Sequence, residues 1–400
     1  MGDAGDLAEG AIKVARAMDG TTLCIQGPPG AGKTYTAAKM ILSLLDDGKK
    51  IGVAANSHKA IENLLRTCVE MANWNLPFAA VDKGAPDLFQ KCEGAIPAKG
   101  NIEIAGYINK VNLFGGTAWL FSRGDMADQL DYLFIDEAGQ VSLANLVGMS
   151  RSAQNLVLIG DQMQLGQPIQ GSHPGESGQS ALEYYLEDHQ TIPPDKGIFL
   201  GKTWRLHPDV CRFISDAFYE GRLQPEEHTK EQAVGGTGKL VNRKAGILFV
   251  PVEHDGNVQD SGEEVEAIGA IVKELIGREF REKDGTTRKI SLEDILFVAP
   301  YNMQVRALQE ALGADARVGS VDKFQGQEAP VVIVSMCASD GNSGPRGLEF
   351  ILSPNRMNVA ISRAKALAIV VGSPVLARAD TNSVDEMRLV NNFARLVLYG

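Results

Sequence analysis

The feature that most constrains this chain is an eight-residue loop between the apolar run Thr22–Gln26 and the amphipathic stretch Lys33–Leu45. Glycines let successive backbone N–H groups turn inward around phosphates, and a helix N-terminus adds positive potential. The sequence therefore predicts a strand, a phosphate-binding loop and a helix, with Lys33 at the β- and γ-phosphates of a nucleoside triphosphate and Thr34 at Mg²⁺. The loop fits the pattern G-x-x-x-x-G-K-[ST] through Gly27, Pro28, Pro29, Gly30, Ala31, Gly32, Lys33 and Thr34.

A pair of adjacent carboxylates ends another apolar run. Asp136 and Glu137 directly follow Leu133–Ile135. We expect Asp136 to bind Mg²⁺, directly or through water, and Glu137 to orient and deprotonate an attacking water. The second carboxylate favours a hydrolase over a kinase. A guanine-reading N-K-x-D motif is not supported, because the nearest match, Asn109–Asn112, lacks the aspartate and precedes the carboxylate pair.

Short β-branched runs alternate with helical patterns along the whole chain, which indicates parallel sheets covered by helices. The turn-rich segment Ile192–Gly197 interrupts this alternation. We therefore predict an α/β fold with two domains of similar size, residues 1–196 and residues 197–400. The predicted strands are Thr22–Gln26, Ile51–Ala55, Tyr132–Ile135, Leu156–Ile159, Ile247–Val250, Ile295–Ala299, Val318–Val321, Val331–Ser335 and Ala368–Val371. The predicted helices are Lys33–Leu45, Lys59–Val69, Leu143–Met149, Pro208–Tyr219, Glu263–Ile276, Gln304–Ala311 and Asn358–Ala364.

The composition is that of a globular protein, with 44% apolar and 22% charged residues in 400. We expect no membrane span and no signal peptide, and five scattered cysteines without a C-x-x-C pair favour reduced thiols in the cytoplasm. The formal net charge of −11 argues against a protein that coats nucleic acid. It permits a local channel that binds one strand, because binding depends on the local patch of charge.

Three further side chains are candidates for the chemistry. Gln164 follows the predicted strand Leu156–Ile159 and could contact a γ-phosphate. Arg205 and Arg363 lie in the second half, where an arginine can neutralise charge that develops during phosphoryl transfer. From the residues alone, a polar loop and two surface ion pairs remain the alternatives.

The order of these segments resembles the up-frameshift-type helicases of superfamily one. More closely, the chain looks like the helicase part of bacterial proteins that join a RecB-like nuclease to such a helicase. The resemblance extends from Gly27 to Arg363. It rests on Asp136–Gln140, Gly160–Leu165, Trp204–Pro208, Ala299–Tyr301, Ser320–Glu328 and Asn358–Ala364.

The resemblance implies two tandem RecA-like domains, the first with the phosphate loop and carboxylates and the second with arginine fingers. It implies that Gln164 senses the γ-phosphate, that Arg205 and Arg363 are the fingers, and that Glu328 hydrogen-bonds the nucleotide. Trp204 takes the place of a tyrosine that stacks on adenine. It also implies 5′-to-3′ movement along single-stranded DNA or RNA. The residues expected to contact the strand are Asn56, Ser57, Thr117, Pro300, Asn302, Ser320 and Asp322.

The sequence departs from this family in three ways. Residues 1–20 contain no glutamine that could read adenine, and only 26 residues precede Gly27, too few for the β-barrel domain of the up-frameshift group. A nuclease-type carboxylate cluster is not evident, so we expect a nuclease domain or other domains to lie outside this chain. The expected function is an ATP- and Mg²⁺-dependent translocase on single-stranded nucleic acid. The alternatives are a P-loop ATPase switch that nucleic acid does not stimulate and a non-catalytic clamp.

Overall fold

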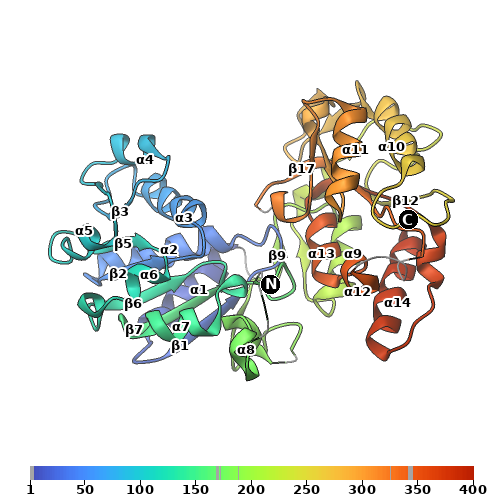
Figure 1. Ribbon diagram of the computed structural model, residues 1–400. Helices are drawn as coiled ribbons and strands as arrows, with labels where there is room; N and C mark the ends of the chain where they lie inside the picture. Colours follow the sequence, from blue (N-terminus) through green and yellow to red (C-terminus); the bar gives the residue numbers. More distant parts are fainter. Residues whose placement is uncertain (1–3, 168–170, 172, 188, 325, 341–345) are drawn as a thin grey trace. The chain divides into compact units, whose positions relative to one another are not determined.

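The apolar runs of the sequence form the strands of two parallel sheets, one in each of two structural units (Figure 1). The computed structural model describes residues 4–167, 171, 173–187, 189–324, 326–340 and 346–400. The first unit comprises Met1–Gln162 and Gly166–Leu200, and the second comprises Met163–Leu165 and Gly201–Gly400. Each unit is a sheet flanked by helices, so the predicted fold of two tandem RecA-like domains is confirmed.

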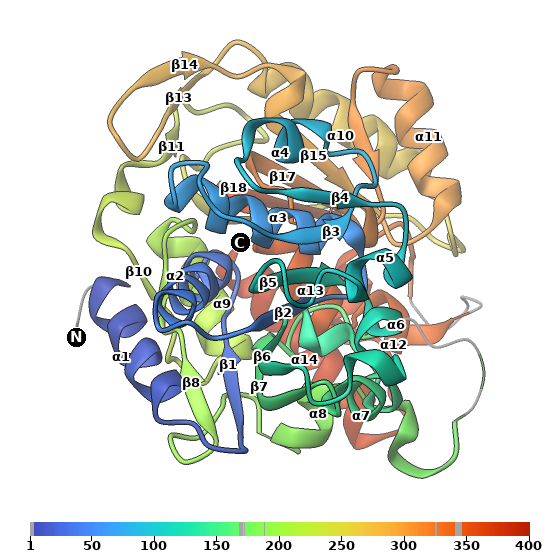
Figure 2. The ribbon, with the colours of Figure 1, turned by 90° about the vertical axis from the view of Figure 1, so that its left-hand side faces the viewer.

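The described strands of the first unit form a sheet in the order β4-β3-β5-β2-β6-β7-β1-β8, in which every neighbouring pair is parallel (Figure 2). The strands are β1 (Thr22–Gln26), β2 (Ile51–Ala54), β3 (Ala79–Val81), β4 (Ile96–Ala98), β5 (Leu113–Gly116), β6 (Leu130–Ile135), β7 (Ala153–Gly160) and β8 (Gly197–Phe199). The helices are α1 (Ala4–Arg16), α2 (Lys33–Asp46), α3 (His58–Met71), α4 (Pro86–Lys91), α5 (Asn101–Ala105), α6 (Ala118–Phe121), α7 (Leu143–Ser150) and α8 (Ala181–Leu186).

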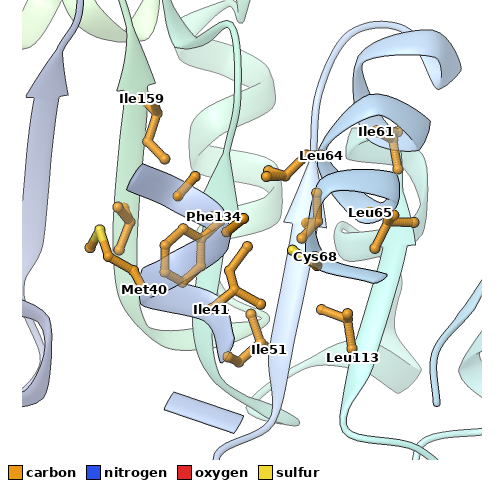
Figure 3. Packing of buried hydrophobic residues seen from close by; sticks show 14 of the residues in the cluster. Met40, Ile41, Ile51, Ile61, Leu64, Leu65, Cys68, Leu113, Phe134 and Ile159 are labelled. Carbon is orange, nitrogen blue, oxygen red and sulfur yellow. The ribbon is translucent and has the colours of Figure 1, made fainter. Parts of the chain in front are cut away.

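Alternate residues of these strands belong to two separate cores on the two faces of the sheet. Phe134 of β6 lies in one core, beside Met40 and Ile41 of α2 (Figure 3). Its neighbours Leu133 and Ile135 lie in the other core, with residues of α6, α7 and α8. This follows from the two-residue repeat of a strand, and it explains why the strands of this sheet are apolar throughout.

The parallel sheet of the second unit has the strand order β12-β18-β17-β15-β16. Helices α10 and α11 cover one face, while α9, α13 and α14 contact β12, β17 or β18 from outside that core. A smaller antiparallel sheet, β11-β13-β14, was not predicted. The strands are β9 (Lys202–Thr203), β10 (Gln224–Pro225), β11 (Ala233–Val234), β12 (Gly246–Pro251), β13 (Glu279–Arg281), β14 (Thr287–Lys289), β15 (Ile295–Val298), β16 (Arg317–Gly319), β17 (Ala329–Ser335) and β18 (Ala364–Gly372). The helices are α9 (Pro208–Phe218), α10 (Gly262–Leu275), α11 (Asn302–Leu312), α12 (Gly347–Ile351), α13 (Pro354–Ile361) and α14 (Val384–Tyr399).

None of the helices in the described part of the chain has the length and apolar character needed to cross a membrane.

The start of α9 is fixed by a histidine. Pro208 occupies the first turn, and the Nδ1 atom of His207 accepts a hydrogen bond from the Asp209 backbone N–H at 3.1 Å. The His207 side chain is 13% exposed. Burial lowers its pKa below the ordinary value of 6.5, although Asp209 and the backbone of Lys230 oppose this shift. His207 is therefore a neutral cap, and only the neutral ring can accept this bond.

We predict that acid destabilises the second unit through His207. Because the pKa is lower in the folded chain, the unfolded chain binds the proton more tightly, and stability falls as the pH drops below about 6.5. The variant His207→Asn keeps a capping side chain without this titration, so its melting temperature should fall less between pH 7.5 and about 5.5 than that of the wild type. His228→Asn, at an exposed histidine of the same unit, is the control and should keep the wild-type slope. Equal slopes in all three proteins would contradict the prediction.

Candidate nucleotide and nucleic-acid sites

The predicted phosphate loop connects β1 to α2. Gly30 and Gly32 have φ angles of 72° and 81°, in the left-handed region that favours glycine. A Cβ added at Gly27 would lie 2.2 Å from Cγ of Lys33, so a larger residue there would displace the Lys33 side chain. The Lys33 ammonium donates to the carbonyl oxygens of Gly27 and Pro28. Helix α2 begins without a side-chain cap, so the loop presents backbone N–H groups and an ammonium, as phosphate binding requires.

The two predicted carboxylates lie at the end of β6. Asp136 is 8% exposed, and its Oδ1 atom accepts a hydrogen bond from the Glu137 N–H at 2.9 Å. Burial raises the pKa of Asp136, while that N–H and the positive charge of Lys33 oppose the shift. Glu137 has a φ of 53°, which is uncommon outside glycine and turns its backbone sharply away from the strand. A buried carboxylate fits a divalent cation, because the cation would compensate the charge that burial penalises.

The residues of the first unit that were predicted to contact nucleic acid lie at the ends of two β-strands. Asn56 and Ser57 follow β2, and Thr117 follows β5. The pairing of Ala54 with Gly116 brings these two ends to the same edge of the sheet. The Ser57 hydroxyl already caps α3, accepting from the Ala60 N–H at 3.1 Å.

Asn56 is tied to the segment that follows the carboxylates. Its amide donates to the backbone carbonyl of Gln140, in the short turn Ala138–Gln140 that comes directly after Glu137. The exposed end of β2 is therefore connected by one hydrogen bond to the turn that positions Glu137.

Arg205 and Glu328 form an ion pair in the second unit. Nε of Arg205 lies 2.6 Å from Oε2 of Glu328, and its Nη1 donates to the carbonyl oxygen of Ser362 at 3.3 Å. Lys365 lies 3.3 Å from the same carboxylate. Burial alone would raise the pKa of Glu328, but the two cations outweigh it and lower the pKa. The carboxylate is therefore ionised and holds Arg205 in place.

Arg363 lies beside this ion pair because Ala329 of β17 pairs with Ala364 of β18. It is 4% exposed, and its Nη1 donates to the Gln327 carbonyl oxygen at 3.4 Å. Both predicted fingers and Glu328 are thus gathered at the amino ends of β17 and β18.

Trp204 directly precedes Arg205, whereas Gln164 lies in another part of the second unit. Trp204 lines a cavity of about 630 Å³, and the Lys202 ammonium lies 4.9 Å from the centre of its ring. Gln164 belongs to Met163–Leu165, which groups with the second unit although it follows β7. The Met163 carbonyl oxygen accepts from the Asn358 side chain at 2.7 Å, which joins this segment to α13.

The four residues predicted to contact nucleic acid from the second unit line a single cavity of about 440 Å³. Besides Pro300, Asn302, Ser320 and Asp322, the lining residues are Gln259, Tyr301, Met303, Arg346, Phe350 and Arg356. Since β15 and β16 are adjacent and parallel, their carboxyl ends bring residues 300–302 and 320–322 together.

Two arginines of this cavity were not predicted. The guanidinium groups of Arg346 and Arg356 lie 4.5 Å and 4.6 Å from the centre of the Phe350 ring, and Arg356 is also 3.3 Å from Asp322. Stacking on Phe350 orients both cations. Arg356 lies near the resemblance motif Asn358–Ala364, but only the fold shows that its side chain reaches the cavity.

A buried polar network supports the segments around this cavity. Glu264, which is fully buried, accepts hydrogen bonds from Ser335 and from the Cys337 N–H, and lies 2.9 Å from Nε2 of His254. The other ring nitrogen of His254 lies 2.8 Å from the Ser339 hydroxyl. Gln304 of α11 donates to Ser335 at 2.8 Å. The network joins the ends of β12 and β17 to α10 and α11, and no sequence pattern indicated it.

Comparison with known proteins gives matches along most of the chain. One family described as an AAA domain matches residues 9–177, and a second family with the same description matches residues 177–375. Over 92% of its own length, the chain is 24% identical to the DNA replication ATP-dependent helicase/nuclease JHS1 of Arabidopsis thaliana. Over 88% of its own length, it is 26% identical to the putative helicase mov-10-B.1 of Danio rerio. It spans 28% and 40% of the length of those relatives.

Among solved structures, the complex of the Arterivirus nonstructural protein 10 helicase with DNA aligns with a TM-score of 0.49 and 17% identity, covering 92% of this chain and 63% of that one. The two AAA-domain matches and the similarity to helicases over nine-tenths of the chain agree with the two RecA-like units. The chain is thus similar to helicases along most of its length, and each half matches a family described as an AAA domain.

Proposed function

We propose that this chain is an ATP-driven motor that moves along single-stranded DNA or RNA in the 5′-to-3′ direction. One observation carries the proposal. The edge of the first sheet presents the phosphate loop after β1, Asp136 and Glu137 after β6, Asn56 after β2, and Thr117 after the neighbouring strand β5. The residues proposed for ATP hydrolysis and those proposed to contact nucleic acid would therefore lie on one rigid sheet.

The first unit would carry out the hydrolysis. Lys33 would contact the β- and γ-phosphates, and Glu137 would orient and deprotonate the attacking water. Thr34 and Asp136 would hold Mg²⁺, which when bound supplies charge that stabilises the phosphates. The left-handed glycines of the loop and the buried carboxylate at the end of β6 support these roles.

The second unit would complete the nucleotide site when ATP binds. We infer that Arg205 and Arg363 neutralise charge on the γ-phosphate, that Gln164 senses this phosphate, and that Glu328 and Trp204 contact the rest of the nucleotide. The ion pair between Arg205 and Glu328 supports a shared role, since ATP would compete with Glu328 for the arginine.

Helix α13 would couple ATP binding to contacts with the nucleic-acid strand. This helix has eight residues, about 12 Å in length. Arg356, in its first turn, lines the cavity proposed for the strand, and Arg363 follows its last turn. A rigid helix between the two sites would transmit a structural change at the nucleotide site to the cavity proposed for the nucleic-acid strand.

Other parts of the protein would add to this motor. Because the chain spans less than half of the two relatives described above, we propose that a nuclease domain or other domains accompany it, as in RecB-like nuclease/helicase fusions. We also propose a cytoplasmic location, where the five free and buried cysteines would stay reduced.

We predict that Lys33→Ala and Glu137→Gln each reduce kcat for ATP hydrolysis by at least about 100-fold, because each removes a group that acts on the γ-phosphate or on the water. Glu137→Gln should still bind ATP, whereas Lys33→Ala should bind it more weakly. Phosphate release and the binding of a fluorescent ATP analogue measure the two effects. Lys39→Ala, on the same helix but outside the loop, is the control. Normal turnover in either active-site variant would rule out the assignment.

We predict that single-stranded nucleic acid stimulates ATP hydrolysis and that the stimulation weakens with salt, since the strand would be held mainly through its backbone. Titration with a DNA and an RNA oligonucleotide of the same sequence tests this and distinguishes the two substrates. Arg356→Ala should lower the slope of log affinity against log salt by about 0.7, the effect of one lost phosphate contact. Arg388→Ala, at an exposed arginine of α14, should not. Turnover without stimulation by either oligonucleotide would favour an ATPase switch instead.

A further inference from the structure

Trp119 is exposed in a way that is unusual for tryptophan. Its side chain is 80% accessible, whereas tryptophan is highly buried on average. Trp74 and Trp204 are half-buried, and each has a lysine ammonium over its ring, at 5.6 Å and 4.9 Å. Within the described residues, Trp119 makes no hydrogen bond, ring contact or cation contact. Most of the Trp119 surface is therefore available to a ligand.

The exposure of Trp119 does not come from a loose segment. Its neighbours in α6, Leu120 and Phe121, are 0% and 1% exposed and belong to the core under the sheet. Gly116 allows this close packing, because a Cβ at that position would lie 2.4 Å from the Leu120 side chain. The two buried residues fix α6 on β5, so the indole is held outward at little further cost in conformational entropy.

The position of α6 relates Trp119 to the proposed strand contacts. The helix begins directly after Thr117, at the carboxyl end of β5. Because Ala54 of β2 pairs with Gly116 of β5, Asn56 and Ser57 leave the sheet at the same edge. Helix α6 contacts both of these strands. Trp119 therefore lies on the part of the first unit that is proposed to bind the strand.

We propose that Trp119 stacks on an unpaired base of the single strand bound to the first unit. This inference rests on the proposed function. Asn56, Ser57 and Thr117 offer small polar groups suited to phosphate and sugar, and none of them offers an aromatic face for a base. Sequence-tolerant binders of single strands combine such backbone contacts with aromatic side chains, because every base has a face that can stack. The indole supplies that second component without reading sequence.

An apolar contact with a partner protein is the competing explanation. Ile102 of α5 and Val147 of α7 are 73% and 65% exposed, and both helices contact α6. The adjacency of Trp119 to Thr117 favours the base, since a protein partner would cover the strand contacts. The two explanations differ in what they require of the side chain. Stacking requires an aromatic ring, whereas an apolar contact accepts leucine.

The test measures strand binding by the full chain without nucleotide. In Trp74→Phe/Trp204→Phe, Trp119 is the remaining tryptophan of the three in the sequence. Titration with a 20-nucleotide oligothymidylate should quench its fluorescence. In the otherwise wild-type chain, Trp119→Ala and Trp119→Leu should raise the Kd for the oligonucleotide by roughly 5- to 100-fold, which corresponds to the loss of one stacked base. Trp119→Phe should lose less, and Ile102→Ser should bind as the wild type does.

The outcomes distinguish a failure of base stacking by Trp119 from a failure of the proposed motor function. If the wild-type chain binds the oligonucleotide but the Trp119 signal and the Kd of the alanine variant do not change, stacking is wrong and the motor is unaffected. Retained affinity in Trp119→Leu, or an equal loss in Ile102→Ser, would also overturn stacking in favour of an apolar patch. If the wild-type chain neither binds single strands nor shows stimulated ATP hydrolysis, the proposed function fails and the inference fails with it.

Discussion

The first unit depends on a parallel sheet that is joined by backbone hydrogen bonds and buried on both faces. This burial limits where polar side chains can lie. Both faces of the sheet are covered, so its strands carry apolar side chains in both directions, as Leu133, Phe134 and Ile135 illustrate. Polar chemistry is thereby confined to the strand ends, and parallel strands place all their carboxyl ends at one edge. The phosphate loop, the carboxylate pair and Asn56 share that edge for this reason.

The second unit uses the same architecture differently. Arg205, Glu328 and Arg363 gather at the amino ends of β17 and β18, whereas the cavity lined by Pro300 and Ser320 lies at the carboxyl ends of β15 and β16. The residues proposed to contact the nucleotide and those proposed to contact the nucleic-acid strand are therefore on opposite edges of one sheet. In the proposed motor, a rigid unit with one set at each edge would convert a change at one edge into displacement at the other.

The buried carboxyl group of Glu264 is held by neighbouring polar groups in this unit. Glu264 receives hydrogen bonds from Ser335 and from the Cys337 N–H, and contacts His254, so its burial leaves few unsatisfied groups. Because the network crosses several loops, it limits how far each can move. The arginines on Phe350 are oriented by a different means, through stacking and the ion pair with Asp322. In both cases orientation is achieved before a ligand arrives.

The sequence alone determined the fold class and predicted the phosphate loop, because periodic apolar runs and the Gly27–Thr34 motif are local patterns. It did not indicate the short strands β3 and β4 or the sheet β11-β13-β14, whose few residues depend on neighbours for their conformation. Arg346 and Arg356 on Phe350, the Glu264 network and the exposure of Trp119 were decided only by tertiary structure. They join residues far apart in the chain, or depend on which neighbours are buried, and a local pattern contains neither kind of information.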